Sequence, residues 1–202
     1  MLFDGPEGAA HTVVLAHGAG APMDSPWMEA MASGLAGRGL RVVRFEFPYM
    51  AARRTDGKRR GPDREPVLRA AWREVVDGLG GGSRLVIGGK SMGGRMASLV
   101  ADEIGAQGLV CLGYPFHPPG RPERLRTAHL EKLETPTLIL QGTRDPFGKP
   151  EEVRGYGLSG RIRVEWIEDG DHDWKPRKKS GRTHAQNLQQ AIETVAGFVK
   201  GV

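Results

Sequence analysis

The sequence predicts a doubly wound α/β fold, with a mainly parallel six-stranded sheet and helices on both faces. Six short apolar runs, rich in β-branched residues, alternate with segments of helical spacing. The runs are nearly continuously apolar, as at residues 137–140 (Thr-Leu-Ile-Leu), which is typical of strands covered on both faces of a parallel sheet. A length of 202 residues with 39% hydrophobic content fits one well-buried core. We therefore expect a single domain over residues 1–202.

The expected elements follow one another along the chain in an alternating order. Strands are predicted at residues 12–16, 41–46, 84–89, 108–113, 136–141 and 162–168. Helices are predicted at residues 26–36, 64–79, 92–104 and 183–200. The last helix repeats Leu188, Ile192, Val195 and Val199 at steps of four, three and four, which places one apolar stripe on a helix that closes the domain. Two prolines and three glycines between residues 142 and 160 allow at most a short helix there.

Composition excludes several classes of protein. No apolar run approaches the ~20 residues of a membrane span, and the N-terminus lacks a signal-peptide pattern, so we expect a soluble, cytoplasmic protein with no membrane partner. The single Cys111 cannot form an internal disulfide, and its apolar neighbours indicate a buried packing role. No pattern of residues points to a metal or a cofactor.

The net charge of +5 is unevenly distributed. Residues 53–64, 121–126 and 175–182, here called the basic segments, hold fourteen lysines and arginines and only three acidic residues. Each follows a predicted strand, so we expect all three to meet at the carboxyl edge of the sheet. They could attract an anionic substrate or an acidic partner, or serve solubility alone. Nucleic-acid binding is disfavoured, because neither interleaved aromatic residues nor a helix-turn-helix pattern accompanies the charge.

A serine lies between a predicted strand and a predicted helix, in the pentapeptide Gly-Lys-Ser-Met-Gly at residues 89–93. This placement is typical of a nucleophile elbow, in which a sharp turn exposes the hydroxyl of Ser91 and glycines on both sides let strand and helix approach closely. The same residues copy the end of a phosphate-binding loop, but the first glycine of that motif would fall at Arg84. The spacing therefore favours the elbow.

A nucleophilic serine needs a base, and the base needs an orienting carboxylate. Asp145 and His172 each follow a predicted strand, and the order Ser91, Asp145, His172 is that of α/β-hydrolases. Each residue taken alone could belong to an ordinary polar turn. His117 and Asp171 are weaker alternatives, since His117 follows another strand and a carboxylate as close in sequence as Asp171 rarely reaches Nδ1 of His172 from the correct side.

An oxyanion hole requires two backbone N–H groups. Met92, directly after the serine, is expected to supply one. The loop His-Gly-Ala-Gly at residues 17–20 follows the first predicted strand and is expected to supply the other, for which we favour the N–H of Ala19 over that of Gly20. His17 then has a structural role, its side chain anchoring the loop.

Together these motifs resemble a small, cap-less α/β-hydrolase. The closer resemblance is to the small hydrolase-like family related to testis-expressed protein thirty and to the hydrolase-like subunit of the nonspecific-lethal chromatin complex. It is carried by residues 17–20, 45–50, 89–95, 113–120, 140–148 and 170–172. The resemblance implies an open, shallow site, and the sequence departs from the full superfamily in lacking the N-terminal strand pair.

These observations predict a serine hydrolase that cleaves an ester, thioester or related acyl bond of a small-molecule substrate. Ser91 would attack, His172 would act as base and then acid, and Asp145 would orient it. The alternative is a non-catalytic module that binds a partner through its basic face, because the family that the sequence resembles includes parts of larger complexes. The sequence specifies neither the substrate-binding residues nor the oligomeric state.

Overall fold

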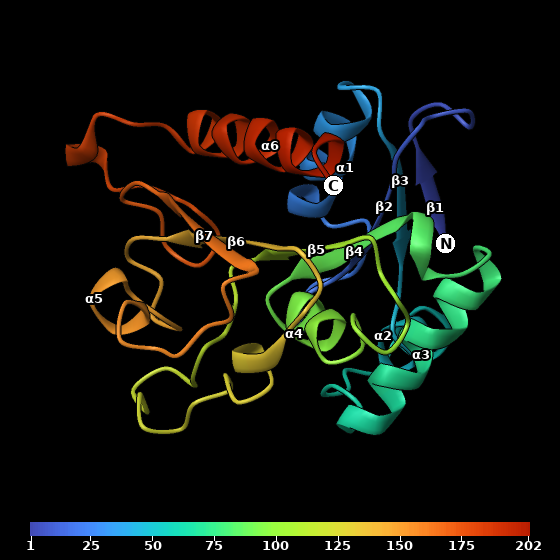
Figure 1. The fold of residues 1–202 in the computed structure, drawn as a ribbon, viewed down its shortest axis with the longest axis horizontal. Coiled ribbons are helices and arrows are strands. Elements are labelled where there is room, and N and C mark those ends of the chain that lie inside the picture. The colour runs from blue at the N-terminus through green and yellow to red at the C-terminus, as the bar shows by residue number, and fades with distance from the viewer.

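The computed structural model describes residues 1–202 and contains one seven-stranded sheet with the order β1-β3-β2-β4-β5-β6-β7 (Figure 1). The strands are β1 (Leu2–Asp4), β2 (Thr12–Ala16), β3 (Arg41–Phe45), β4 (Leu85–Lys90), β5 (Gly108–Leu112), β6 (Thr137–Gly142) and β7 (Ile162–Ile167). Strands β2 to β7 run parallel, and β1 pairs antiparallel with β3. The predicted doubly wound α/β class is confirmed, whereas the predicted number of six strands is one too few.

The additional strand, β1, is a three-residue edge strand in which Leu2 pairs with Arg44 and Asp4 with Val42. The Asp4 carboxylate forms an ion pair with the buried Arg44 guanidinium, with 3.0 Å between Asp4 Oδ2 and an Arg44 terminal nitrogen. A segment of three residues is too short to show a periodic pattern of apolar residues. Its place at the edge of the sheet also depends on Arg44, which lies 40 positions after Asp4. A single antiparallel strand therefore precedes the first predicted one.

Helices cover both faces of the sheet (Figure 1). They are α1 (Pro26–Ala36), α2 (Pro48–Asp56), α3 (Glu65–Gly78), α4 (Met92–Ser98), α5 (Pro150–Val153) and α6 (His184–Lys200), with 3₁₀ turns at Gly82–Arg84, Leu130–Lys132 and Lys178–Ser180. Helices α1 and α6 pack together on one face, and α3 and α4 on the other. The predicted helix at 26–36 is confirmed, the one at 92–104 is α-helical only to Ser98, and α2 was not predicted. None of these helices combines the length and apolarity that crossing a bilayer requires.

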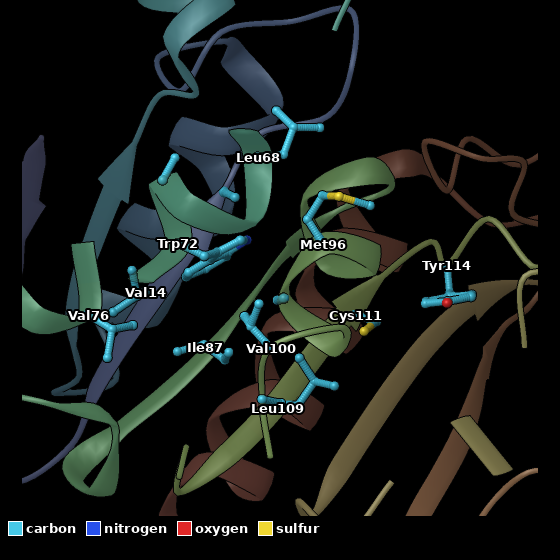
Figure 2. Packing of buried hydrophobic residues seen from close by; sticks show 14 of the residues in the cluster. Val14, Leu68, Trp72, Val76, Ile87, Met96, Val100, Leu109, Cys111 and Tyr114 are labelled. Carbon is cyan, nitrogen blue, oxygen red and sulfur yellow. The ribbon is translucent and has the colours of Figure 1, made fainter. Parts of the chain in front are cut away.

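Strand β2 shows why the strand sequences lack alternation. Val13 and Leu15 belong to the hydrophobic cluster under α1 and α6, whereas Val14 and Ala16 belong to the cluster under α3 and α4. Because both faces of the sheet are buried, the four buried positions of β2, residues 13–16, are all apolar. Figure 2 shows the second cluster, in which Trp72 of α3 lies over the sheet.

Cys111 lies in that same cluster and is fully buried (Figure 2). Burial raises the pKa of its thiol well above the usual value. The predicted packing role is confirmed, and the thiol is chemically protected.

Candidate active site

Ser91 occupies a strained turn between β4 and α4. Its backbone dihedrals are φ 51° and ψ −114°, which a residue with a side chain rarely adopts. The flanking glycines allow β2 to approach, since a Cβ on Gly89 would lie 2.2 Å from the carbonyl oxygen of Ala16 and one on Gly93 would lie 2.5 Å from it. The turn therefore has the geometry of a nucleophile elbow.

Three side chains from three separate segments form one hydrogen-bonded chain. Asp145 Oδ2 lies 2.7 Å from His172 Nδ1, and His172 Nε2 lies 2.9 Å from Ser91 Oγ. An ionised carboxylate can only accept, so Nδ1 carries the proton and the neutral ring accepts the Ser91 hydroxyl proton at Nε2. The imidazole is thus in the tautomer that can take a proton from the serine.

Asp145 is fully buried in the turn after β6. Its second oxygen, Oδ1, accepts the backbone N–H of Phe147 at 2.9 Å, which fixes the carboxylate plane. The Phe147 ring lies against the imidazole of His172, with 4.4 Å between ring centroids. The imidazole is therefore fixed at its edge by the carboxylate and on one face by an aromatic ring.

The acidic neighbours of His172 are engaged elsewhere. Asp171 Oδ1 accepts the backbone N–H groups of Asp173 and Lys175, both at 2.9 Å. Asp169 pairs with Arg177 and Arg144. Neither carboxylate contacts the imidazole, and His117 instead lies 3.5 Å from Glu152. Of the predicted alternatives, only Asp145 reaches Nδ1.

The His-Gly-Ala-Gly loop at residues 17–20 is held by two side chains. His17 is fully buried, receives the Phe47 backbone N–H at Nε2 (3.1 Å) and therefore donates from Nδ1 to the Gly18 carbonyl (2.7 Å). Burial lowers its pKa, in keeping with a neutral ring. The Tyr49 hydroxyl donates to the Ala19 carbonyl at 2.9 Å. These contacts agree with the anchoring role predicted for His17.

Anchoring the carbonyls also orients the N–H groups. In a planar trans peptide the N–H points opposite to the carbonyl, and no peptide bond in the chain is cis. With the carbonyls of Gly18 and Ala19 turned toward His17 and Tyr49, the N–H groups of Ala19 and Gly20 face the other way. The N–H groups of Ala19 and Met92 donate to no backbone carbonyl, which leaves both open for an oxyanion.

A pocket of about 310 Å³ opens at Ser91. It is lined by the loop and the start of α1, by Lys90 and Ser91, and by Phe147 and the histidine segment: Gly18, Ala19, Gly20, Ala21, Ser25, Trp27, Met28, Lys90, Ser91, Phe147, His172 and Asp173. The wall is largely apolar, and the Lys90 amine and the Asp173 carboxylate in it lie 3.5 Å apart. Such a pocket suits a small, mainly apolar group beside the serine.

Two pocket residues, Lys90 and Trp27, were not predicted from the sequence, nor was Tyr49, which holds the loop at residues 17–20. Lys90 appeared only within the elbow pentapeptide and the phosphate-loop pattern, with no role of its own, and Trp27 appeared only within a predicted helix. Tyr49 lies in a segment quoted for the resemblance, but nothing local indicates that its hydroxyl reaches the Ala19 carbonyl, 30 positions earlier. The signal for Lys90 was its place directly before the nucleophile, in a strand that is otherwise apolar.

The basic segments do not line this pocket. Several of their arginines pair with carboxylates, such as Arg54 with Glu46 at 2.6 Å and Arg177 with Asp169. Lys175 lines a neighbouring hollow that shares Trp27 and Asp173 with the pocket. None of the fourteen cations of the basic segments therefore forms part of the pocket wall at Ser91, and salt bridges hold several of their arginines.

A second serine and histidine also form a hydrogen bond. Ser98 Oγ lies 2.8 Å from His129 Nε2, with the Tyr114 hydroxyl 3.5 Å from the same nitrogen. Ser98 lies in α4 and donates to the Arg95 carbonyl one turn earlier. Neither residue lines the pocket at Ser91, and no carboxylate hydrogen-bonds to His129.

Comparison with known proteins assigns this chain to a family. Residues 9–200 match the family described as "Alpha/beta hydrolase domain". A lidless α/β serine hydrolase from Xanthomonas campestris is 20% identical, with a TM-score of 0.71 over 95% of this chain and 85% of that one. A dienelactone hydrolase from Anabaena variabilis is 24% identical, with a TM-score of 0.70 over 95% and 88%.

A third structure, of a Butyrivibrio proteoclasticus protein with ferulic acid bound, is 15% identical, with a TM-score of 0.66 over 96% of this chain and 94% of that one. At these identities the structural matches establish the fold alone. The family match, by contrast, covers nearly the whole chain, and the chain therefore belongs to the α/β-hydrolase domain family.

Proposed function

We propose that the protein is a serine hydrolase that cleaves an ester, thioester or related acyl bond, with Ser91 as nucleophile. The observation that carries this proposal is the chain of two hydrogen bonds from Asp145 through His172 to Ser91, with the serine on a strained elbow. A serine hydroxyl is a weak nucleophile without such a base.

In the first half-reaction, Ser91 Oγ attacks the acyl carbonyl carbon while its proton passes to His172 Nε2. Asp145 stabilises the imidazolium that forms. The negative charge moves to the former carbonyl oxygen, which the N–H groups of Ala19 and Met92 would stabilise. When the intermediate collapses, the bond to the leaving group breaks, and the leaving group takes the proton from Nε2.

In the second half-reaction, water attacks the acyl-serine, giving one proton to Nε2 as its oxygen bonds to the acyl carbon. Collapse of this second intermediate breaks the bond to Ser91 Oγ, which recovers the proton from His172. The acid product leaves and the enzyme returns to its starting state.

The lining of the pocket supports an uncharged, mainly apolar substrate. Lys90 and Asp173 pair with each other, and none of the fourteen cations of the basic segments lines the wall. Trp27 and Phe147 offer aromatic surface, which suits an aryl or short alkyl group. The Butyrivibrio protein binds ferulic acid, an aromatic acid, so esters of aromatic acids of similar size are suitable first substrates.

Salt dependence tests the charge of the substrate. Paired charges in the pocket offer little net attraction, and salt at 0.1 M screens over about 10 Å. We expect kcat/KM for a neutral butyrate ester and for the half-ester of succinate to show equally weak salt dependence. A steep fall for the succinate ester alone would assign the basic segments a role in attracting anions, as the sequence allows.

The alternative function is that of a non-catalytic module within a larger complex. It is suggested by the narrower resemblance to the family of testis-expressed protein thirty. We propose that narrower resemblance, and a cytoplasmic location, on the sequence alone. A binding module has no need of a strained serine hydrogen-bonded to an oriented histidine, so we favour the enzyme.

Turnover of short-chain p-nitrophenyl esters tests the proposed function. We expect the native protein to hydrolyse them and Ser91→Ala to abolish turnover with nearly unchanged thermal stability, since Ser91 is not part of the hydrophobic clusters. The matched control is Ser98→Ala on the neighbouring helix, which should retain activity. Equal turnover by Ser91→Ala and the native protein would refute the mechanism.

A further inference from the structure

Lys90 has an ionisable side chain in β4, a strand that is otherwise apolar and fully buried. It is the last residue of β4, directly before Ser91, and its side chain is only 9% exposed. Burial lowers the pKa of its amine, and nearby carboxylates, those of Asp173 and Asp145 above all, oppose that shift. Burying an ammonium group is costly unless it is paired and hydrogen-bonded, so its contacts indicate what it does.

Those contacts join three walls of the pocket. The ammonium Nζ donates to the backbone carbonyl of His172 at 2.7 Å and lies 3.5 Å from Asp173 Oδ1. It also lies 5.4 Å from the centroid of the Trp27 ring, at the start of α1. The aliphatic part of the side chain runs beside the loop before α1, since a Cβ on Gly18 would lie 3.5 Å from Lys90 Cγ.

The segment that carries His172 starts at a strand distant from the one that carries Ser91. It leaves β7, whereas Ser91 follows β4, and β5 and β6 lie between these strands. With neighbouring strands about 4.8 Å apart, the segment must cross about 14 Å of the sheet edge to bring the imidazole to the serine.

Contacts with β6 and with the segment after β5 mark the route. At the end of β6, a Cβ on Gly142 would lie 2.3 Å from the Gly170 carbonyl oxygen, so the histidine segment passes directly over that strand. After β5, a Cβ on Gly113 would lie 3.3 Å from both His172 Cε1 and Lys90 Nζ. The absent side chain at Gly113 leaves room for the ammonium to reach the His172 carbonyl.

We propose that Lys90 is a positioning residue, whose ammonium ties the backbone of His172 to the nucleophile strand and so holds the imidazole within reach of Ser91. This inference rests on the proposed function for its kinetic consequence. The hydrogen bond that His172 Nδ1 donates to Asp145 fixes one end of the imidazole ring. Trp27 and Arg144 bond the backbone of the neighbouring residues Asp173 and Asp169. The Lys90 contact adds the anchor at the backbone carbonyl of His172 itself.

The first test replaces the ammonium by an isosteric apolar group. We expect Lys90→Met to lower kcat for a neutral ester by about 100-fold, the effect of a displacement of about 1 Å in a catalytic group, with KM little changed. Lys58→Met, at an exposed position, is the matched control and should behave as the native protein. An unchanged kcat, or a change confined to KM, would overturn the proposal, since the latter would mean that Lys90 binds substrate.

Chemical rescue separates positioning from a general effect of the substitution. Lys90→Cys should show the same loss of kcat, and alkylation with 2-bromoethylamine, which restores an ammonium at nearly the same length, should recover most of it. The reaction is suited to this chain because its natural thiol, Cys111, is fully buried and has a raised pKa. Alkylation that modifies the introduced thiol without restoring kcat would contradict the proposal.

A readout without substrate distinguishes this inference from the proposed function. The Nδ1 proton of His172, identified by the loss of its low-field NMR signal in His172→Ala, should be sharp in the native protein and broadened or absent in Lys90→Met. If the native protein hydrolyses no ester, the proposed function fails while this measurement still tests Lys90. A signal identical in both proteins would show that Lys90 does not hold the imidazole.

Discussion

The two serine–histidine pairs of this protein have nearly equal hydrogen bonds and different surroundings. Ser91 and His172 are 2.9 Å apart, and Ser98 and His129 are 2.8 Å apart. Ser91 lies on a strained turn at a pocket, and its histidine is oriented by a buried carboxylate. Ser98 is the last residue of α4, donates its hydroxyl to a backbone carbonyl, and faces a histidine without a carboxylate partner.

The difference teaches that the distance between serine and histidine does not by itself make a nucleophile. The first pair adds a defined tautomer, an exposed hydroxyl and two free backbone N–H groups, each supplied by a different segment. The second pair joins the buried hydroxyl of Ser98 in α4 to the half-buried imidazole of His129 in the segment after β5, which is a structural task. Substitutions in the two pairs should therefore separate activity from stability.

The largest effect is expected from the two histidines. His172→Ala removes the base and should lower kcat by about 10⁶-fold, as loss of the base does in a well-studied serine protease. His129→Ala should leave kcat within a few-fold and lower the melting temperature instead, because Ser98 Oγ loses a buried partner. Steady-state kinetics and thermal unfolding of both variants check this, and a greater loss of activity in His129→Ala would reverse the assignment of the two pairs.

The next effect concerns the carboxylate that distinguishes the pairs. Asp145→Asn keeps the shape but favours the wrong tautomer, and should lower kcat by about 10⁴-fold. Asp171→Asn is the matched control, because that side chain accepts only backbone N–H groups of its own segment. If kinetics of the two variants showed Asp171→Asn to be the more damaging, Asp145 could not be the orienting acid.

A smaller effect is expected at the loop that faces Ser91. Tyr49→Phe removes the hydrogen bond to the Ala19 carbonyl, worth about 1 kcal/mol, and frees the peptides whose N–H groups point at the pocket. We expect kcat to fall about five-fold, the kinetic equivalent of that energy, with KM little changed. Tyr156→Phe is the control, since its hydroxyl makes no hydrogen bond to the loop at residues 17–20, and equal kinetics in both variants would rule out this role for Tyr49.

The smallest effect is a pH dependence of stability that belongs to the second pair. Burial, and then the Arg95 charge, lower the pKa of His129 to about 4, with Arg69 acting in the same direction and Glu65 opposing. The unfolded chain then binds one more proton than the folded protein between about pH 6.5 and 4, so stability falls as pH falls through this range. Urea unfolding at pH 7 and pH 4.5 should show a smaller difference in His129→Gln than in the native protein, and an undiminished difference would contradict the assigned cause.

How far the sequence could predict the site depends on how local each signal is. The elbow follows from a pentapeptide, because glycine is the only residue that allows strand and helix to pack so closely beside Ser91. Asp145 and His172 follow from the rule that parallel strands end at one edge of the sheet. Their hydrogen bonds require only that two turns after strands meet, which that rule provides.

Features that depend on distant partners could not be predicted. The strand β1 depends on Arg44, and the role of Lys90 depends on a carbonyl 82 positions later. The same rule predicts the basic segments at this edge of the sheet, but it does not specify the direction of their side chains. Salt bridges such as that between Arg54 and Glu46 hold part of this charge, and none of the fourteen cations lines the pocket.

A fluorophosphonate probe tests the central claim most directly, because it phosphonylates a serine hydroxyl only where a base and an oxyanion site activate it. After reaction with the native protein, proteolysis and mass spectrometry should locate the label on Ser91. Ser98→Ala should label as fast as the native protein, and Ser91→Ala and His172→Ala should not label. A native protein that fails to react, or a label on Ser98, would contradict the account.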